Sequence, residues 1–303
     1  MGASLEVAGL TKSFGDMAAV RGLDFAVQPG QLFAFLGPNG AGKSTTINML
    51  CTFLRPDRGR ALINGYELGK QDGQIRASIG AVFQEGLLDR GLTVRENLLV
   101  RASFYGLNRA ARGEAVLRAA RAAGAGEFLD RQYGKLSGGQ RRRADIARAL
   151  VHAPRILFLD EPTTGLDPQT RRGVWETVSA LREQGTTVFL TTHYMEEAAA
   201  ADAVVVIDAG RIAAQGTPAQ LRERYARDQL RLFPADAAAL SAALANLGLR
   251  PAQAGGGFIL PLDHTLDALP ILTACQPHLA GFEVVAGTMD DAFLGITGKE
   301  MEP

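Results

Sequence analysis

A glycine-rich stretch constrains this sequence more than any other feature. It lies between the apolar residues 32–36 and the helix-like segment 46–53, and it consists of Gly37, Pro38, Asn39, Gly40, Ala41, Gly42, Lys43, Ser44 and Thr45. The spacing G-x-x-x-x-G-K-S lets bare backbone N–H groups surround a polyphosphate at a positive helix N-terminus. Lys43 would then reach the β- and γ-phosphates, and Ser44 can ligate Mg²⁺. A left-handed turn also uses glycine, but it has no need of an adjacent Lys-Ser pair.

The composition is that of a chain able to form a sizeable core. It has 303 residues, of which 47% are hydrophobic, and this length favours about two domains. The 32 Lys and Arg balance the 32 Asp and Glu, so no global basic field indicates a nucleic-acid partner, and we expect none. Cys51 and Cys275 are far apart and form no CxxC pair, which indicates neither a disulfide framework nor a zinc site.

The sequence contains no candidate for insertion into a membrane. The first residues lack a basic segment followed by an apolar one, so no secretory signal is visible. No stretch approaches the roughly 20 apolar residues that a membrane span needs. We therefore expect any role at a membrane to be carried out from the cytoplasmic side and through another chain.

Two carboxylates follow a strongly apolar run. Residues 156–159 read as a parallel strand buried on both faces, and functional groups of open α/β sheets gather where such strands end. Asp160 would hold Mg²⁺ directly or through its water, and Glu161 would polarise an attacking water. The pair could instead initiate a turn before Pro162, but the upstream phosphate loop favours the catalytic interpretation.

Another polar residue ends the apolar run 187–192. A lone histidine is usually structural, yet His193 is expected at the same sheet edge as Lys43 and Glu161 and is better explained as a γ-phosphate contact. Asp167 precedes a helix-like segment and could be no more than its N-cap.

The stretch Leu136-Ser137-Gly138-Gly139-Gln140 opens a further helix. Ser137 and Gln140 have the spacing of a capping box. Each glycine in the first helical turn costs on the order of 1 kcal/mol against Ala, and the following Arg141-Arg142-Arg143 opposes the helix dipole. Both costs make sense if the terminus approaches an anion, with bare N–H groups and the cations converging on it. We therefore predict a second phosphate-contacting element built on the capping box.

Two single residues carry weaker signals. Phe14 precedes the phosphate loop and could stack on a base, although a lone Phe is as often part of a core. Gln84 ends the predicted strand 79–83, where a polar residue is usually just solvated. Residues 92–123 have helical periodicity and predict a helical insertion in an α/β domain. From about Asp228 the nucleotide-type motifs cease, and we expect a small α+β domain.

With these pieces placed, residues 5–225 resemble the ATP-binding subunit of ABC transporters. The matching motifs are, in order, the stacking aromatic Phe14, the Walker A loop Gly37–Thr45, the Q-loop Gln84, the signature Leu136–Gln140, the Walker B strand Ile156–Glu161, the D-loop Gly165-Leu166-Asp167 and the switch histidine His193. The departure is Phe14, where Tyr is commoner; it loses a hydroxyl but keeps the ring face.

This resemblance implies a fold and a domain organisation. The fold is an α/β P-loop NTPase of the ABC type, with a sheet core, a helical subdomain at about residues 90–150 and a small α+β C-terminal accessory domain. The nucleotide-binding domain would span residues 1–227 and the accessory domain residues 228–303. Residues 165–174 and 288–298 resemble the daunorubicin-resistance type of drug-export ATPase, which carries such a domain.

The resemblance also implies an activity, cofactors and site residues. The chain would be an ATPase whose ATP-driven dimer closure and opening powers a membrane exporter of a drug, antibiotic or other hydrophobic compound. The catalytic residues would be Glu161, His193 and Lys43. ATP would contact Phe14, residues 37–45, Gln84, Ser137, Gly138, Gly139, Gln140 and Asp167, and Mg²⁺ would be held by Ser44, Gln84 and Asp160.

The expected partners follow from the single set of motifs. A second copy would pair head to tail, so that each signature loop closes over the ATP held by the other chain's Walker A loop. The surface between Gln84 and Leu99 would contact a separate integral permease subunit, which places the chain peripherally at the cytoplasmic face of the membrane.

Three other functions are compatible with parts of this sequence. An ABC-type ATPase that moves no solute typically has two nucleotide domains or long coiled-coil inserts, and neither is visible. A small-molecule kinase with the same loop would explain neither the signature pentapeptide nor Glu161. A mainly regulatory role for the C-terminal domain stays open.

Overall fold

The computed structural model describes residues 2–299 and divides into two compact units, with the boundary between Gln215 and Gly216. The predicted boundary at residue 228 falls at the start of a strand further along the chain. Helix α8 (Pro218–Tyr225) belongs instead to the second unit, where it packs on α11 (Met289–Thr297). The two helices approach so closely that a Cβ at Gly295 would overlap the carbonyl oxygen of Tyr225.

A six-stranded sheet forms the centre of the first unit, in the order β10-β9-β3-β8-β7-β6. Its strands are β3 (Leu32–Leu36), β6 (Ile79–Val82), β7 (Ile156–Asp160), β8 (Thr187–Thr192), β9 (Ala203–Asp208) and β10 (Arg211–Gly216). β3 pairs in parallel with β8 and β9, and β7 pairs in parallel with β6 and β8. Strands β3, β7 and β8 are buried at every position, which explains their unbroken apolar character.

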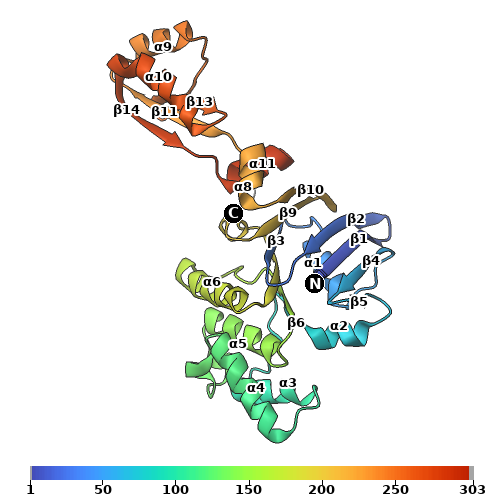
Figure 1. Cartoon of the computed structure of the whole chain (residues 1–303). Coiled ribbons are helices and arrows are strands. Elements are labelled where there is room, and N and C mark those ends of the chain that lie inside the picture. The colour runs from blue at the N-terminus through green and yellow to red at the C-terminus, as the bar shows by residue number, and fades with distance from the viewer. Residues whose placement is uncertain (1, 300–303) are drawn as a thin grey trace. The chain divides into compact units, whose positions relative to one another are not determined.

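A second, antiparallel sheet packs against the first within this unit (Figure 1). Its order is β2-β1-β4-β5, from β1 (Leu5–Phe14), β2 (Met17–Val27), β4 (Arg58–Ile63) and β5 (Tyr66–Glu67). A stack of aromatic rings joins the two sheets: Phe25 lies 5.6 Å from Phe33, and Phe189 lies 5.2 to 6.0 Å from Phe25, Phe33, Phe35 and Phe158, between ring centroids.

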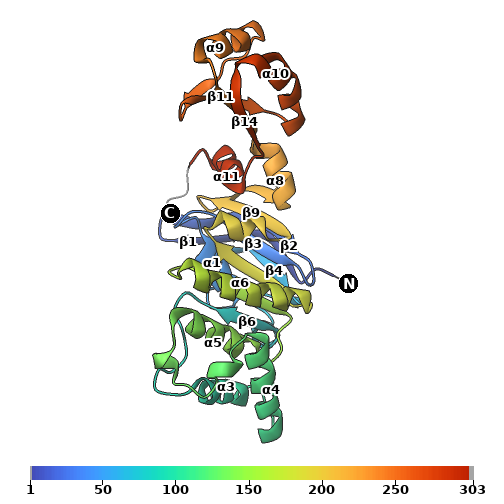
Figure 2. The same cartoon turned by 90° about the vertical axis from the view of Figure 1, so that its left-hand side faces the viewer.

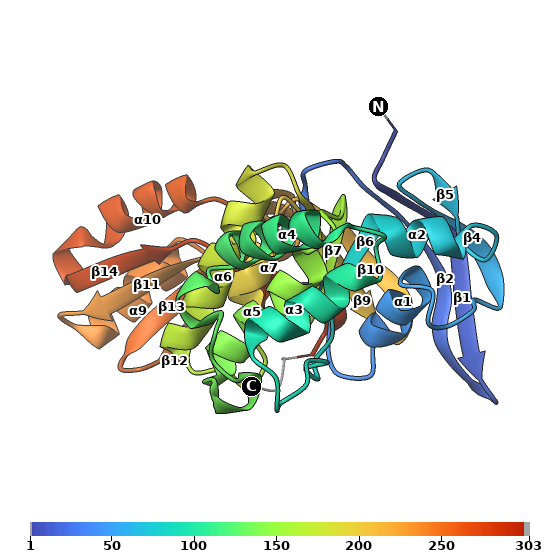
Figure 3. The same cartoon turned by 90° about the horizontal axis from the view of Figure 1, so that it is seen from below.

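The helices of the first unit fall into two groups. α1 (Lys43–Leu50), α2 (Asp72–Ser78), α6 (Pro168–Glu183) and α7 (Met195–Ala199) accompany the sheets. α3 (Val94–Ser103), α4 (Arg109–Ala122) and α5 (Gly138–Leu150) lie together, as Figure 3 shows, and single 3₁₀ turns occur at Gly126–Phe128 and Tyr133–Lys135. Helices therefore occupy the segment for which a helical insertion was predicted.

The second unit is a small α+β fold, as predicted. Its antiparallel sheet has the order β12-β13-β11-β14, from β11 (Asp228–Pro234), β12 (Ala252–Ala254), β13 (Gly257–Leu262) and β14 (Leu279–Val285). Helices α9 (Ala237–Asn246) and α10 (Ala268–Cys275) pack on it, with 3₁₀ turns at Thr265–Asp267 and Gln276–His278 (Figure 2). Its core is separate from that of the first unit and includes Leu230, Leu244 and Phe258.

The aromatic stack is expected to dominate the stability of the first unit. Phe189→Ala removes a fully buried ring from the centre of the stack and should lower the free energy of unfolding by about 3–5 kcal/mol in urea titrations. Phe104→Ala is the matched control, because its ring is 72% exposed and should change that free energy by less than about 0.5 kcal/mol. Equal losses in the two variants would contradict this account of the core.

Candidate active site

The carboxyl ends of three parallel strands define the site. In the sheet register Leu36 lies beside Thr192, and Asp160 lies beside Thr191. The residues that follow these strands, including Glu161 and His193, therefore emerge at one edge, as the sequence predicted.

The glycine loop follows β3 at this edge and leads directly into α1. Gly40 and Gly42 have φ angles of 79° and 104°, which L side chains rarely adopt. A Cβ at Gly37 would overlap the carbonyl oxygen of Ile207, so the loop needs glycine for close backbone packing as well as for its conformation.

Lys43 holds the loop and the neighbouring strand together. Its side chain is 4% exposed, and Nζ donates to the carbonyl oxygens of Gly37 at 2.6 Å and Pro38 at 3.1 Å. The same Nζ lies 3.2 Å from Glu161 Oε1. A buried cation thus faces the space above the loop, where polyphosphate oxygens can be neutralised.

Glu161 is held between two cationic or potentially cationic groups. Besides Lys43, His193 Nδ1 lies 3.5 Å from Glu161 Oε2, and Thr164 Oγ1 donates to Oε2 at 3.1 Å. Burial alone would raise the pKa of the Glu161 carboxyl, but the charge and hydrogen bond of Lys43, together with His193, outweigh burial and hold that pKa below its ordinary value. Glu161 also has a φ of 45°, a strained conformation that turns it out of the strand direction.

The residues beside Glu161 form a set of oxygen donors. Ser44 Oγ donates to Asp160 Oδ1 at 3.3 Å, and Thr191 Oγ1 donates to the same oxygen at 2.6 Å. Hydroxyl and carboxylate oxygens are the ligands Mg²⁺ prefers, and Mg²⁺ needs few of them when phosphates complete its shell, so the donors fit this ion. Within residues 2–299, no group of three or more His, Cys, Asp or Glu gathers as a metal cluster of its own.

Thr191 is a functional residue that the sequence analysis missed. Its buried hydroxyl donates to the Asp160 carboxylate and also accepts from the backbone N–H of Glu161 at 3.0 Å, so it fixes one carboxylate and the backbone that carries the other. Buried Glu197 similarly accepts a hydrogen bond from Thr163 Oγ1 and ties the segment after β7 to α7. The available signal was polarity within otherwise apolar surroundings: Thr191 and Thr192 end a buried strand.

Gln84, Phe14 and Asp167 lie outside this cluster. Gln84 is exposed on the loop after β6, and its side chain makes no hydrogen bond to another described residue. Phe14 ends β1 with its ring 47% exposed and Lys12 Nζ 5.7 Å from the ring centroid. Asp167 caps α6 by accepting from Thr170 N–H at 3.1 Å, so the N-cap interpretation holds for its position in this chain.

The signature segment forms the expected capping box. Gln140 N–H donates to Ser137 Oγ at 3.3 Å, and Ser137 N–H donates to Gln140 Oε1 at 3.1 Å. The glycines differ from each other: Gly138 is exposed, whereas Gly139 is buried and a Cβ there would overlap the side chain of Thr170. Close packing on α6 therefore requires Gly139, a reason that the sequence analysis did not anticipate.

The sequence predicts that the side chains of Arg141, Arg142 and Arg143 converge on an anion at this helix terminus. That prediction is wrong. Each guanidinium instead donates to a different backbone carbonyl. Arg141 Nη1 bonds to Leu136 O at 2.7 Å, Arg142 Nη1 to Phe83 O at 2.6 Å and Arg143 Nη1 to Gly124 O at 3.1 Å. The helix places consecutive side chains about 100° apart, so they separate around its axis.

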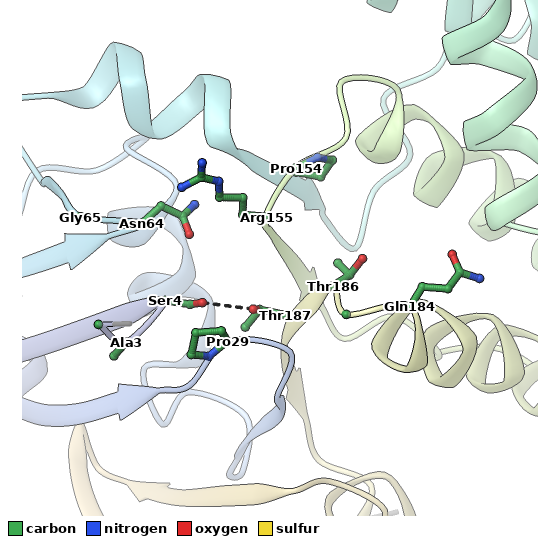
Figure 4. Close-up of a pocket in the computed structure, with 12 residues that line it drawn as sticks. Ala3, Ser4, Pro29, Asn64, Gly65, Pro154, Arg155, Gln184, Thr186 and Thr187 are labelled. Atoms are coloured by element: carbon green, nitrogen blue, oxygen red, sulfur yellow. Dashed lines mark hydrogen bonds between the residues drawn. The ribbon is translucent and has the colours of Figure 1, made fainter.

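A cavity of about 800 Å³ lies elsewhere in this unit (Figure 4). Its lining includes Pro29, Arg155 and Thr187, which precede or begin the central strands, and Thr187 Oγ1 lies 3.2 Å from Ser4 Oγ. These are the amino ends of the strands, so the cavity is distinct from the cluster around Lys43. Choosing the site by cavity volume alone would therefore have placed it at the wrong end of the sheet.

Comparison with known proteins agrees with this geometry. Residues 20–164 match the ABC transporter family. The daunorubicin/doxorubicin resistance ATP-binding protein DrrA of Streptomyces peucetius is 39% identical over 97% of this chain and 92% of its own length. This chain belongs to the family of ABC transporter ATP-binding proteins. It binds and hydrolyses ATP, and that hydrolysis powers transport.

Other members of the ABC family resemble the chain along its length or in its fold. The Nod factor export ATP-binding protein I of Rhizobium sp. (strain N33) is 37% identical over 99% of this chain and 98% of its own. CbiO1 of Clostridium perfringens, described as part of an ABC transporter complex, has a TM-score of 0.68 and 30% identity over 73% of this chain and 91% of its own. A dimeric ATP-binding cassette bound to ADP and Pi has a TM-score of 0.63 and 27% identity over 70% and 98%.

We predict that ATP turnover by this ABC ATPase depends on the Thr191 hydroxyl. Thr191→Val keeps the side-chain shape but leaves the Glu161 N–H without its acceptor, so turnover should fall roughly tenfold or more in steady-state ATPase assays. Thr177→Val is the control: Thr177 is also buried, but its hydroxyl bonds only within α6, to Gly173 O. Comparable turnover in the two variants would show that Thr191 does not organise the carboxylates.

Proposed function

We propose that two copies of this chain close head to tail around ATP, each completing the other's site. The observation that carries the proposal is the division of the chemistry between two separate places on one chain. Lys43, Glu161 and His193 form one cluster, whereas Ser137 and Gly138 are exposed at the start of α5. In the described part of the chain the signature residues 137–140 make no hydrogen bond to the loop 37–45. A phosphate on the loop would thus take its second set of donors from the partner copy.

Hydrolysis would use the groups that surround Glu161. Its carboxylate is ionised, because its pKa lies below the ordinary value, and it accepts a hydrogen bond from the attacking water and aligns it on the γ-phosphate. Lys43 is placed to neutralise the β- and γ-phosphate oxygens, and His193 to contact the γ-phosphate as the oxygen charge develops. Catalysis by positioning and charge fits a site in which Lys43, Asp160 and Glu161 already have fixed partners.

We propose that Ser44 and Asp160 hold Mg²⁺ and that Gln84 is a third, more peripheral ligand. When bound, Mg²⁺ would neutralise negative charge on the phosphates. Thr191 holds Asp160 in the orientation needed for this role. The Gln84 side chain makes no hydrogen bond to Ser44 or Asp160 among the described residues, and it would join them when the loop after β6 closes on the ion.

An integral membrane subunit is the proposed second partner. Large apolar side chains are exposed around the segment that carries Gln84: Phe53, Leu87, Leu99, Val100 and Phe104. Exposed apolar residues of this size suit a protein interface better than solvent. Within residues 2–299 no helix has the length and apolarity to cross a bilayer, so a separate permease would supply the membrane path. The chain would then act peripherally, at the cytoplasmic face.

The transported compound is inferred from the relatives. DrrA is named for daunorubicin and doxorubicin resistance, and the Rhizobium protein for Nod factor export. We infer that this chain powers export of a drug, antibiotic or other hydrophobic compound. The second unit, including the sheet that starts with β11 at Asp228, would be its accessory domain.

Glu161→Gln tests the assignment of the catalytic base. The amide keeps the shape but cannot accept a proton, so turnover should fall on the order of 100-fold or more while ATP binding persists. ATP should then accumulate in a closed dimer, measured by size-exclusion chromatography with multi-angle light scattering.

Lys43→Ala is the contrasting variant. It removes the cation from the loop, so ATP affinity itself should weaken and no ATP-bound dimer should form. Normal hydrolysis by Glu161→Gln would refute the assignment of the base, and unchanged nucleotide affinity in Lys43→Ala would refute the role of the loop.

A further inference from the structure

The open edge of the central sheet is covered by side chains of α5 and of the turn that follows it. β6 is the last strand in the sheet order and pairs only with β7, so alternate carbonyl groups face away from the sheet. Arg148 Nη2 donates to Ala81 O at 2.5 Å, and His152 Nε2 donates to Ile79 O at 2.8 Å. Figure 2 shows β6 beside α5. These two bonds satisfy edge carbonyls that would otherwise be buried without a partner.

Arg142 makes the same kind of bond to backbone carbonyl groups that lie beyond the end of β6. Its Nη1 donates to Phe83 O at 2.6 Å, and its Nη2 lies 3.4 Å from Gln84 O. β6 ends at Val82, so Arg142 holds the loop and not the strand. It is also two residues after Gln140, which closes the capping box of the signature segment. One rigid side chain therefore joins the signature helix to the backbone of Gln84.

A second contact involves Gly86, in the same loop after β6. A Cβ at Gly86 would overlap the hydroxyl of Tyr133, and that hydroxyl lies 3.1 and 3.2 Å from the two carboxylate oxygens of Asp145. Asp145 lies on α5 three residues from both Arg142 and Arg148, on one face of the helix. On one side of Glu85 the loop is therefore bonded to α5 through Arg142, and on the other side Gly86 packs closely on Tyr133, whose hydroxyl bonds to α5.

The burial of these charges calls for an explanation beyond stability. Arg142, Asp145 and Arg148 are 7%, 5% and 9% exposed. Desolvation makes buried ion groups weak contributors to net stability, although removal of one partner is costly. Capping of the edge strand accounts for Arg148. It does not account for Arg142, whose acceptors lie in the loop.

We propose that Arg142 is a positioning residue that couples the signature segment to Gln84. The inference rests on the proposed function, in which Ser137 meets the nucleotide of the partner copy. Movement of α5 toward that nucleotide carries the carbonyl groups of Phe83 and Gln84 with it. The Gln84 side chain then moves relative to Ser44 and Asp160. Engagement of one chain's signature is thereby transmitted to that chain's own hydrolysis site.

The direct test compares Arg142→Gln with Arg148→Gln in the full chain. Both variants shorten a buried arginine on the same helix face, but only Arg142 bonds to the loop. In nucleotide-free protein, cleavage after Glu85 by a glutamate-specific protease should become about tenfold faster in Arg142→Gln and stay near wild type in Arg148→Gln, because only Arg142 holds the carbonyl groups of this loop. Arg142→Lys keeps the charge but loses the two-pronged geometry, and should show an intermediate rate.

Turnover provides the second readout. Arg142→Gln should lower kcat about tenfold while ATP affinity stays within about twofold, because Lys43 and the phosphate loop are untouched. Since Arg142 acts through Gln84, the double variant Arg142→Gln/Gln84→Ala should be no slower than Gln84→Ala alone. A purely structural role would instead multiply the two losses in kcat.

The readouts separate the inference from the function on which it rests. Unchanged cleavage after Glu85 in Arg142→Gln overturns the link to the loop, whatever becomes of the dimer. Faster cleavage with unchanged kcat, or with losses that multiply in the double variant, overturns the coupling. A wild-type chain that never dimerises with ATP would refute the proposed function but leave the cleavage result intact.

Discussion

The parallel register of β3, β7 and β8 is the constraint on which the rest of the site depends. Parallel strands end at one edge, so Gly37, Glu161 and His193 arrive together although the first is separated from the other two by more than a hundred residues of sequence. The strands are fully buried, and their positions are therefore fixed by packing around Phe189. The polar groups at the ends of these strands are therefore held in fixed positions as well.

The same sheet explains how chemistry and movement are divided in this ABC ATPase. Its centre carries the fixed groups, each with a partner: Lys43 with Glu161, and Asp160 with Thr191. Its edge strand β6 leads into an exposed loop, and α5 covers that edge. A change at the signature end of α5 can therefore reach the loop without disturbing the central strands. This arrangement suits a cycle in which nucleotide closes a dimer and hydrolysis reopens it.

Local pattern was enough to predict much of this structure. The glycine loop, the carboxylates after 156–159 and the histidine after 187–192 all follow from strand ends that share an edge. Contacts between distant segments were not predictable. Gly139 packs on Thr170, the run 141–143 spreads to three separate carbonyl groups, and α8 joins α11 across the boundary expected at 228. Each depends on which surface lies opposite, and one sequence does not contain that information.

Cross-linking between copies tests the central claim most directly. Cys51 and Cys275 are both buried, so Asn39→Cys and Ser137→Cys introduce the accessible thiols in one chain. With Glu161→Gln to hold ATP in place, mild oxidation should give a disulfide-linked dimer when ATP is present and monomer when it is absent. Each single cysteine variant should give no disulfide-linked dimer, and an equal mixture of the two should cross-link. A double variant that stays monomeric with ATP bound, or whose two introduced thiols link to each other within one chain, would contradict the head-to-tail clasp.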